Sequence, residues 1–247
     1  MTFYDPIEST FYSWCVERLL ASAELDRYTA GGVVELGAGS GIPLLEAVSR
    51  TETTTRIRGF ERDPEAFRTA RRLVELKGPA NYTVELADFF EYAETADERC
   101  VIANPPYLPG SDLPGSDGAG RGGLGALCGG ERGAQVTRRL LDGPFDLALL
   151  MVASISDPLG VLEEASRRGY RVLDWSVRPI TFGRYSREPA VWEQIRAQAE
   201  DGRAFFAPDG YLLAGVTWIR DGGSPAAGTD PDALARVLTV GAGTAGS

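Results

Sequence analysis

The sequence contains no histidine, and Lys77 is its only lysine. Without histidine there can be no Ser-His or Cys-His pair for nucleophilic catalysis and no histidine-ligated metal. The single lysine does not belong to a G-x-x-x-x-G-K-[ST] loop, so a P-loop nucleotide hydrolase is also excluded. Any reaction that this chain catalyses must therefore proceed without a histidine base and without a P-loop lysine that binds phosphate.

Cysteine and long apolar runs are equally scarce. The three cysteines, Cys15, Cys100 and Cys128, are odd in number and far apart, which fits neither a disulfide framework nor a zinc site. No apolar run approaches the roughly 18 residues of a membrane span, and the acidic N-terminus lacks a signal-peptide pattern. These absences predict a cytoplasmic protein that holds no metal and has no membrane segment.

Basic residues are outnumbered by acidic ones, and the formal net charge of the 247-residue chain is −10. Affinity for nucleic acid normally depends on neutralising phosphates with a broad basic face. The charge balance therefore argues against nucleic acid as a partner and favours a small molecule or a peptide. The charge balance does not exclude a local patch of arginines.

Apolar runs of strand length alternate with amphipathic stretches of helical length, which indicates an α/β fold with a mainly parallel sheet flanked by helices. Seven strands are expected, at 32–36, 55–60, 82–86, 100–103, 147–153, 171–177 and 211–219. Helices are expected at 7–25, 64–76, 158–168 and 189–200. Ser9 or Thr10 is available to cap the first helix.

The length suits one large domain, which we expect to occupy residues 1–220. Residues 1–30 would form a helical cover, and the glycine-rich stretch 108–130 would form a lid loop, with a disordered insertion as the alternative. The segment 221–247 is rich in Gly, Ala and Ser and predicts a flexible tail, in which only 233–240 can form a short helix.

The first expected strand leads into a glycine-rich turn with the spacing G-x-G-x-G, followed by an apolar helix. Glycines at a strand-to-helix turn let the backbone approach a nucleotide cofactor closely. The spacing differs from the G-x-G-x-x-G dinucleotide pattern, and a tight turn without a ligand is the alternative. The candidate cofactor-binding residues here are Glu35, Gly37, Ala38, Gly39 and Gly41.

The second expected strand carries an acidic residue, Glu61, at its carboxyl end, 20 residues after Gly41. A carboxylate in this place can accept hydrogen bonds from both hydroxyls of a ribose. Asp63, two residues later, is a candidate cap for the following helix. A solvated strand end is the alternative interpretation of Glu61.

The fourth expected strand ends in Asn104-Pro105-Pro106-Tyr107. Two prolines in succession cannot continue a helix and make a stiff exit from the strand. The exit presents the amide of Asn104 and the ring of Tyr107, which suit a planar nitrogen substrate. Asn104, Pro105 and Tyr107 are therefore the candidate catalytic residues, and Asn104 is also a candidate cofactor-binding residue. A proline-rich strand exit without a ligand is the alternative.

Taken together, the stretch from Val33 to Tyr107 resembles the Rossmann-like class I methyltransferases with an N-P-P-Y signature. It is most similar to the catalytic domain of the release-factor glutamine N5-methyltransferases, the HemK-like family. A G-G-x-x-G segment at 129–133 adds to the likeness. The resemblance implies S-adenosylmethionine (SAM) as cofactor, Asp88 as acceptor for its adenine amino group, and Phe89 as part of the adenine pocket. Ordinary core is the competing interpretation of Phe89.

An amide or exocyclic amino nitrogen is a poor nucleophile because its lone pair is delocalised. Hydrogen bonds from the substrate NH₂ to the Asn104 side-chain oxygen and the Pro105 carbonyl would direct that lone pair toward a methyl donor, while Tyr107 stacks on the planar group. We therefore predict a SAM-dependent N-methyltransferase for a planar amide, guanidino or amino nitrogen of a small molecule or peptide. The alternatives are a protein glutamine N5-methyltransferase, a DNA or RNA adenine N6-methyltransferase, and a catalytically silent SAM-binding module.

Overall fold

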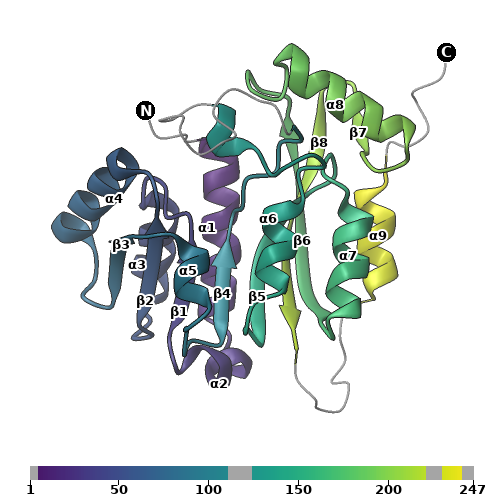
Figure 1. The fold of residues 1–247 in the computed structure, drawn as a ribbon. Helices are drawn as coiled ribbons and strands as arrows, with labels where there is room; N and C mark the ends of the chain where they lie inside the picture. Colours follow the sequence, from purple (N-terminus) through teal and green to yellow (C-terminus); the bar gives the residue numbers. More distant parts are fainter. Residues whose placement is uncertain (1–4, 111–123, 221–229, 241–247) are drawn as a thin grey trace. The chain divides into compact units, whose positions relative to one another are not determined.

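The computed structural model describes residues 5–110, 124–220 and 230–240 (Figure 1). Within these residues the chain forms two compact units. Unit 1 comprises the chain up to Asn104 together with Gly143–Leu150. Unit 2 comprises Pro105–Asp142 and the chain from Met151 onward.

Unit 1 is built on a parallel sheet. Its strands are β1 (Val33–Leu36), β2 (Ile57–Glu61), β3 (Tyr82–Leu86), β4 (Cys100–Ala103) and the first four residues of β5 (Leu147–Ala153). They follow one another in the order β3-β2-β1-β4-β5. Every residue of β1 and β4 is buried, because both faces of a parallel sheet are covered. The carboxyl ends of β1, β2, β3 and β4 therefore share one edge.

The helices of unit 1 are 3 to 15 residues long, and three of them begin at a residue whose side chain caps the first turn. They are α1 (Pro6–Leu20), η1 (Ala23–Leu25), α2 (Asp26–Thr29), α3 (Ile42–Thr51), α4 (Pro64–Lys77) and α5 (Phe89–Ala93). The helix predicted at 7–25 thus ends at Leu20. Its cap is Asp5 rather than Ser9 or Thr10, because the Asp5 side chain accepts from the amides of Ile7 and Glu8.

Unit 2 contains antiparallel strands and four α-helices among its described residues. The strands are β6 (Arg171–Thr181), β7 (Phe206–Ala207) and β8 (Gly210–Ile219), and the helices are η2 (Leu124–Leu127), α6 (Gln135–Leu141), α7 (Pro158–Arg167), α8 (Pro189–Glu200) and α9 (Pro231–Leu238). In the strand order β8 follows the carboxyl end of β5, and β6 follows β8. β6 and β7 each pair antiparallel with β8.

The fold confirms the predicted α/β class with a mainly parallel sheet flanked by helices. An eighth strand, β7, lies between the helix expected at 189–200 and the strand expected at 211–219, where no strand is predicted. It is only two residues long and pairs Phe206 with Tyr211 and Ala207 with Gly210, so it extends a turn rather than forming a periodic element. Such a short strand leaves no alternation for a sequence pattern to reveal.

The segment predicted as a flexible tail contains α9. Asp230 caps this helix by accepting from the amide of Asp232, and Leu234 and Leu238 are completely buried. Leucines four residues apart lie on one helical face, and that face packs against α7 and β6. The rest of 221–247 that would form the tail, 221–229 and 241–247, lies outside the described residues.

The ends of the expected lid loop pair with each other. Leu108 forms an isolated bridge with Cys128, and Gly110 forms one with Gly130. The central part, 111–123, lies outside the described residues, so the lid and the insertion both remain predictions. In the part of the chain that is described, no helix is long and apolar enough to cross a membrane.

Candidate functional site

The glycine-rich turn between β1 and α3 depends on three left-handed glycines in unit 1. Gly37, Gly39 and Gly41 have φ angles of 72°, 56° and 72°, which glycine adopts without strain. A Cβ added at Gly41 would lie 3.2 Å from the Cβ of Ala70, whereas one added at Gly37 would meet nothing within 4 Å. Close packing therefore demands glycine at Gly41, while the turn leaves open space at Gly37.

Glu61, at the end of β2, is tied to the glycine-rich turn. Its Oε2 accepts from the amide of Gly39 at 2.9 Å, and its Oε1 accepts from the amide of Asp63 at 2.8 Å. An ionised carboxylate has about four lone-pair sites, so two further hydrogen bonds can still be accepted. Asp63 caps α4 as expected, through the amides of Glu65 and Ala66. The structure thus brings the predicted acid and the predicted turn together.

Glu35, a candidate cofactor-binding residue in β1 just before the turn, is buried. Its Oε1 accepts from the Tyr12 hydroxyl at 3.1 Å, and its Oε2 accepts from the Tyr82 hydroxyl at 3.4 Å. Burial raises the pKa of Glu35 to about 8, although both hydroxyls act in the opposite direction. The carboxyl group is therefore mostly protonated at neutral pH, and tyrosines of α1 and β3 donate hydrogen bonds to it.

Asp88 and Phe89 begin α5, immediately after β3. Asp88 is exposed, and its Oδ1 accepts from the amide of Phe90 at 2.8 Å, so it is the cap of this short helix. Phe89 is buried, with its ring 5.7 Å from that of Phe60 and 6.2 Å from that of Phe145. Phe89 thus belongs to the core of unit 1, as its competing interpretation has it.

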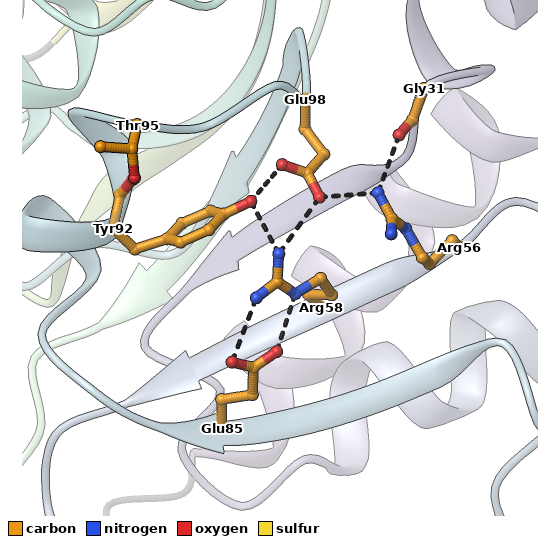
Figure 2. A network of polar contacts seen from close by, with 7 residues as sticks. All are labelled: Gly31, Arg56, Arg58, Glu85, Tyr92, Thr95 and Glu98. Carbon is orange, nitrogen blue, oxygen red and sulfur yellow. Dashed lines mark hydrogen bonds and ion pairs between the residues drawn. The ribbon is translucent and has the colours of Figure 1, made fainter.

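A polar network holds α5 against the strands (Figure 2). Arg58 of β2 donates to both carboxylate oxygens of Glu85 on β3, at 2.7 and 3.1 Å. The same guanidinium donates to the Tyr92 hydroxyl at 2.8 Å, and Tyr92 in turn contacts the buried carboxylate of Glu98. The network joins β2, β3 and α5, and so it fixes the helix that Asp88 caps.

The charge state of this network follows from its contacts. Burial works against ionisation of Glu98, but the Tyr92 hydroxyl, Arg58 and Arg56 together lower the pKa of that carboxyl group. Burial and the neighbouring Glu98 raise the pKa of Tyr92 to about 12. At neutral pH the network therefore contains a neutral tyrosine between an ionised glutamate and an arginine.

Asn104 follows β4, and the surroundings of its side-chain oxygen are unusual. Its side-chain Oδ1 is buried and has no hydrogen-bond partner among the residues that the structure describes. Buried polar atoms in proteins are nearly always paired, so an unpaired acceptor at a strand end suits a ligand that donates a hydrogen bond. The sequence had singled out this residue.

In unit 2, the backbone after Asn104 is fixed by neighbours that the sequence did not reveal. The Tyr107 hydroxyl lies 2.7 Å from the Tyr211 hydroxyl, and the Tyr107 carbonyl accepts from Ser156 Oγ at 2.6 Å. A Cβ added at Gly129 would lie 2.4 Å from the Pro106 carbonyl oxygen, and one at Gly133 would lie 2.2 Å from that of Tyr107. The G-G-x-x-G segment is therefore glycine-rich because its backbone packs directly on Pro106 and Tyr107.

The sequence indicates only some of the residues that contact Glu35 and Tyr107. Tyr12 lies four residues before Val16, on the buried face of α1, so its burial follows from the helical pattern. Tyr211 and Ser156 are distant from Tyr107 in sequence and carry no signal that links them to it.

No protein-family model matches the chain. Among curated proteins, the chain is 29% identical over 93 residues to the tRNA1(Val) (adenine(37)-N6)-methyltransferase of Actinobacillus succinogenes, covering 36% of this chain and 39% of the relative. It is 33% identical over 91 residues to the enzyme of the same name from Mannheimia succiniciproducens, covering 36% of each. The chain thus spans less than two fifths of the length of these curated relatives.

Among solved structures, the catalytic domain of hMettl16 in complex with the MAT2A 3′UTR hairpin 1 superposes with a TM-score of 0.57 at 14% identity. The match covers 91% of this chain and 74% of that domain. At this identity the likeness concerns the fold.

These comparisons correct one expectation. A small-molecule or peptide substrate with no nucleic-acid partner is wrong, because the curated relatives are named as tRNA methyltransferases. The names of these relatives specify adenine, whereas the release-factor resemblance implied glutamine. Net charge misled because it is summed over the whole chain, whereas contact with phosphates depends on where guanidinium groups gather locally. The chain has the Rossmann-like α/β fold of the class I methyltransferases.

Proposed function

We propose that this protein is a SAM-dependent methyltransferase that acts on the N6 amino group of an adenine in RNA. The single observation that carries the proposal is the buried Oδ1 of Asn104 at the end of β4, which has no hydrogen-bond partner among the described residues. The names of the curated relatives support adenine in tRNA as the acceptor class. The predicted N-methyl transfer to a planar amino nitrogen is compatible with this acceptor, because the N6 group of adenine is one.

The residues of unit 1 fit SAM. The turn leaves open space at Gly37, where a side chain would otherwise stand between the backbone and a ligand. Glu61 is anchored by two backbone amides and keeps lone pairs for the ribose hydroxyls. Asp88, exposed at the adjacent strand end, is the candidate acceptor for the adenine amino group of the cofactor. When bound, SAM would supply a methyl group on a positively charged sulfur.

The acceptor nitrogen would be held by Asn104 and Pro105. Asn104 Oδ1, which receives no hydrogen bond from the part of the chain that the structure describes, can accept one N–H of the amino group, and the Pro105 carbonyl can accept the other. Both hydrogen bonds localise the nitrogen lone pair away from the ring, and placing reacting atoms about 3 to 3.5 Å apart supplies much of the rate enhancement. Tyr107, fixed by Tyr211 and Ser156, would offer its ring to the flat base.

No histidine base is required for this reaction. The amino nitrogen becomes acidic as it is alkylated, so its proton can leave to water after methyl transfer. A chain without histidine is therefore compatible with a mechanism that depends on positioning and hydrogen bonding.

The decisive experiment is to incubate the protein with SAM and an unmodified tRNA transcript, and to digest the RNA to nucleosides for mass spectrometry. We expect N6-methyladenosine to form in proportion to S-adenosylhomocysteine. Asn104→Ala should lower turnover at least about a hundredfold, as expected for loss of a hydrogen bond made at the reacting group, and should leave SAM affinity nearly unchanged.

Asn81, the other asparagine of the chain, provides the matched control. Its side-chain amide donates to the carbonyls of Thr53 and Thr55, so Asn81→Ala should lower stability but leave turnover per folded molecule unchanged. Methylation of a different nucleoside, or SAM binding without any S-adenosylhomocysteine across RNA and protein acceptors, would overturn the proposed function. A large loss of SAM affinity in Asn104→Ala would instead move that residue into the cofactor site.

A further inference from the structure

Three arginines of unit 2 gather around one buried carboxylate. Arg138 of α6 donates to Asp157 Oδ2 at 2.7 Å. Arg203, after α8, lies 3.5 Å from both carboxylate oxygens, and Arg132 lies 4.0 Å from Oδ2. Asp157 itself is buried and stands at the start of α7. Four separate segments of the chain therefore meet at this cluster, which we call the Asp157 arginine cluster.

The cluster carries a surplus of positive charge. Among the described residues, Asp157 is the one carboxylate within ion-pair distance of any of its three arginines. Three guanidinium groups against one carboxylate leave a net charge of about +2 at neutral pH. One arginine would be enough to pair a buried aspartate, so pairing alone does not account for three.

The arginines are held in place but remain accessible. The side chains of Arg132, Arg138 and Arg203 are 45%, 30% and 39% exposed, while that of Asp157 is 3% exposed. A Cβ added at Gly160 would lie 2.4 Å from Arg138 Nη2 and 2.6 Å from Asp157 Oδ2, so the helix leaves room for this pair only because the residue is glycine. Asp157 thus holds Arg138 through a direct hydrogen bond and Arg132 and Arg203 at longer ion-pair distances, while all three arginine side chains remain partly exposed.

Arg138 also has an unsatisfied donor. Its Nε is buried and has no hydrogen-bond partner in the described part of the chain. A guanidinium presents five N–H donors in a planar fork, which suits the oxygens of a phosphate. The cluster therefore combines net positive charge, oriented forks and an unused donor.

The cluster lies next to the N-P-P-Y segment within unit 2. Ser156, which precedes Asp157, donates to the Tyr107 carbonyl at 2.6 Å. Arg132 precedes Gly133, whose backbone packs on the same carbonyl. Two of the segments that form the cluster are thus in direct contact with Tyr107.

We propose that Arg132, Arg138 and Arg203 bind phosphates of the RNA backbone beside the target adenine. The inference rests on the proposed function, since it takes RNA as the substrate. Phosphate contacts position a nucleic acid without reading its sequence, and Arg side chains are the usual ligands. A compact cluster explains how a chain of net charge −10 engages a polyanion without a broad basic face.

The test is the salt dependence of RNA binding, measured by fluorescence anisotropy with an unmodified, labelled tRNA transcript. Plots of log affinity against log salt should become shallower by about 0.7 to 0.9 for each of Arg132→Gln, Arg138→Gln and Arg203→Gln. The loss should be the same for RNAs of different sequence, and SAM affinity should not change. Arg138→Lys, which keeps the charge, should retain most of the slope.

Arg167→Gln is the matched control. Arg167 lies at the far end of α7, is 63% exposed and pairs with Glu163 and Glu164, so its removal should leave the slope unchanged. Equal slopes for the wild type and all three cluster variants would overturn the phosphate site, even if the wild type still forms N6-methyladenosine. Absence of that product in the wild type would instead overturn the proposed function. If Arg138→Gln fails to fold, the more exposed Arg132→Gln and Arg203→Gln decide the question.

Discussion

Glu35 links the folding of unit 1 to pH through a single residue. Its pKa is raised from the ordinary 4.5 to about 8 by burial. Between these values the folded protein keeps a proton that the unfolded chain releases, so stability falls as pH rises from about 4.5 to about 8. Below about 4.5 the group is protonated in both states, and there the penalty is absent.

We therefore expect Glu35→Gln to remove this pH dependence. The amide has the shape of the protonated carboxyl group and can still accept from one tyrosine hydroxyl, but it does not titrate. Thermal melting between about pH 5 and pH 8 should show the wild type losing stability relative to the variant as pH rises. Glu24→Gln, at an exposed glutamate, is the control and should follow the wild type. Parallel curves for wild type and Glu35→Gln would mean that Glu35 is ionised in the folded protein.

Single residues differ in how far the sequence could predict their place. Glu61 and Asn104 could be singled out because each ends a recognisable strand, and the ends of neighbouring parallel strands share one edge of the sheet. Glu35 was assigned to the cofactor by its position beside the glycines, but its burial depends on Tyr12 and Tyr82, which come from other elements. A strand pattern does not say which tertiary neighbours a side chain meets.

At the scale of elements, α9 tests whether the chain after 220 is part of the folded core. Leu234 and Leu238 are completely buried within unit 2, where α9 packs against α7 and β6. Truncating a buried leucine removes apolar contacts and leaves a cavity, so Leu238→Ala should lower the free energy of unfolding by about 2 to 5 kcal/mol. Chemical denaturation monitored by tryptophan fluorescence measures this change.

Arg236→Ala on the same helix is the control for helix propensity and surface charge. Its side chain is 69% exposed and pairs with Asp230, so its loss should cost no more than about 1 kcal/mol. A Leu238→Ala change as small as that of Arg236→Ala would show that α9 does not contribute to the core in solution.

Elements with a clear period were predicted well, and irregular ones were not. β5 could be recognised because all seven of its residues are apolar and buried, and α8 has the predicted bounds, 189–200. Sequence patterns did not predict the end of α1 at Leu20, the two-residue β7 or the start of α9, because caps and tertiary contacts decide these features. The Asp157 arginine cluster could not be predicted for the same reason, since Asp157 and Arg203 are distant in sequence from Arg132 and Arg138.

At the scale of the whole molecule, added salt should affect protein stability and RNA binding in opposite directions. A net charge of −10 destabilises the compact state by repulsion among like charges, and added salt screens that repulsion. The Debye length shortens from about 30 Å at 0.01 M salt to about 8 Å at 0.15 M, so the relief should be nearly complete near physiological salt. The proposed attraction between the arginine cluster and RNA phosphates would be screened over the same range.

We therefore expect sodium chloride, raised from about 0.01 to about 0.15 M, to increase the melting temperature while it weakens RNA binding. Differential scanning fluorimetry and anisotropy on the same samples would measure the two responses. Cluster variants such as Arg203→Gln should keep the rise in melting temperature, because the net charge barely changes, but lose part of the salt effect on binding. A melting temperature that falls with salt would mean that attractive ion pairs, such as those of Arg58 and Glu85, outweigh the long-range repulsion.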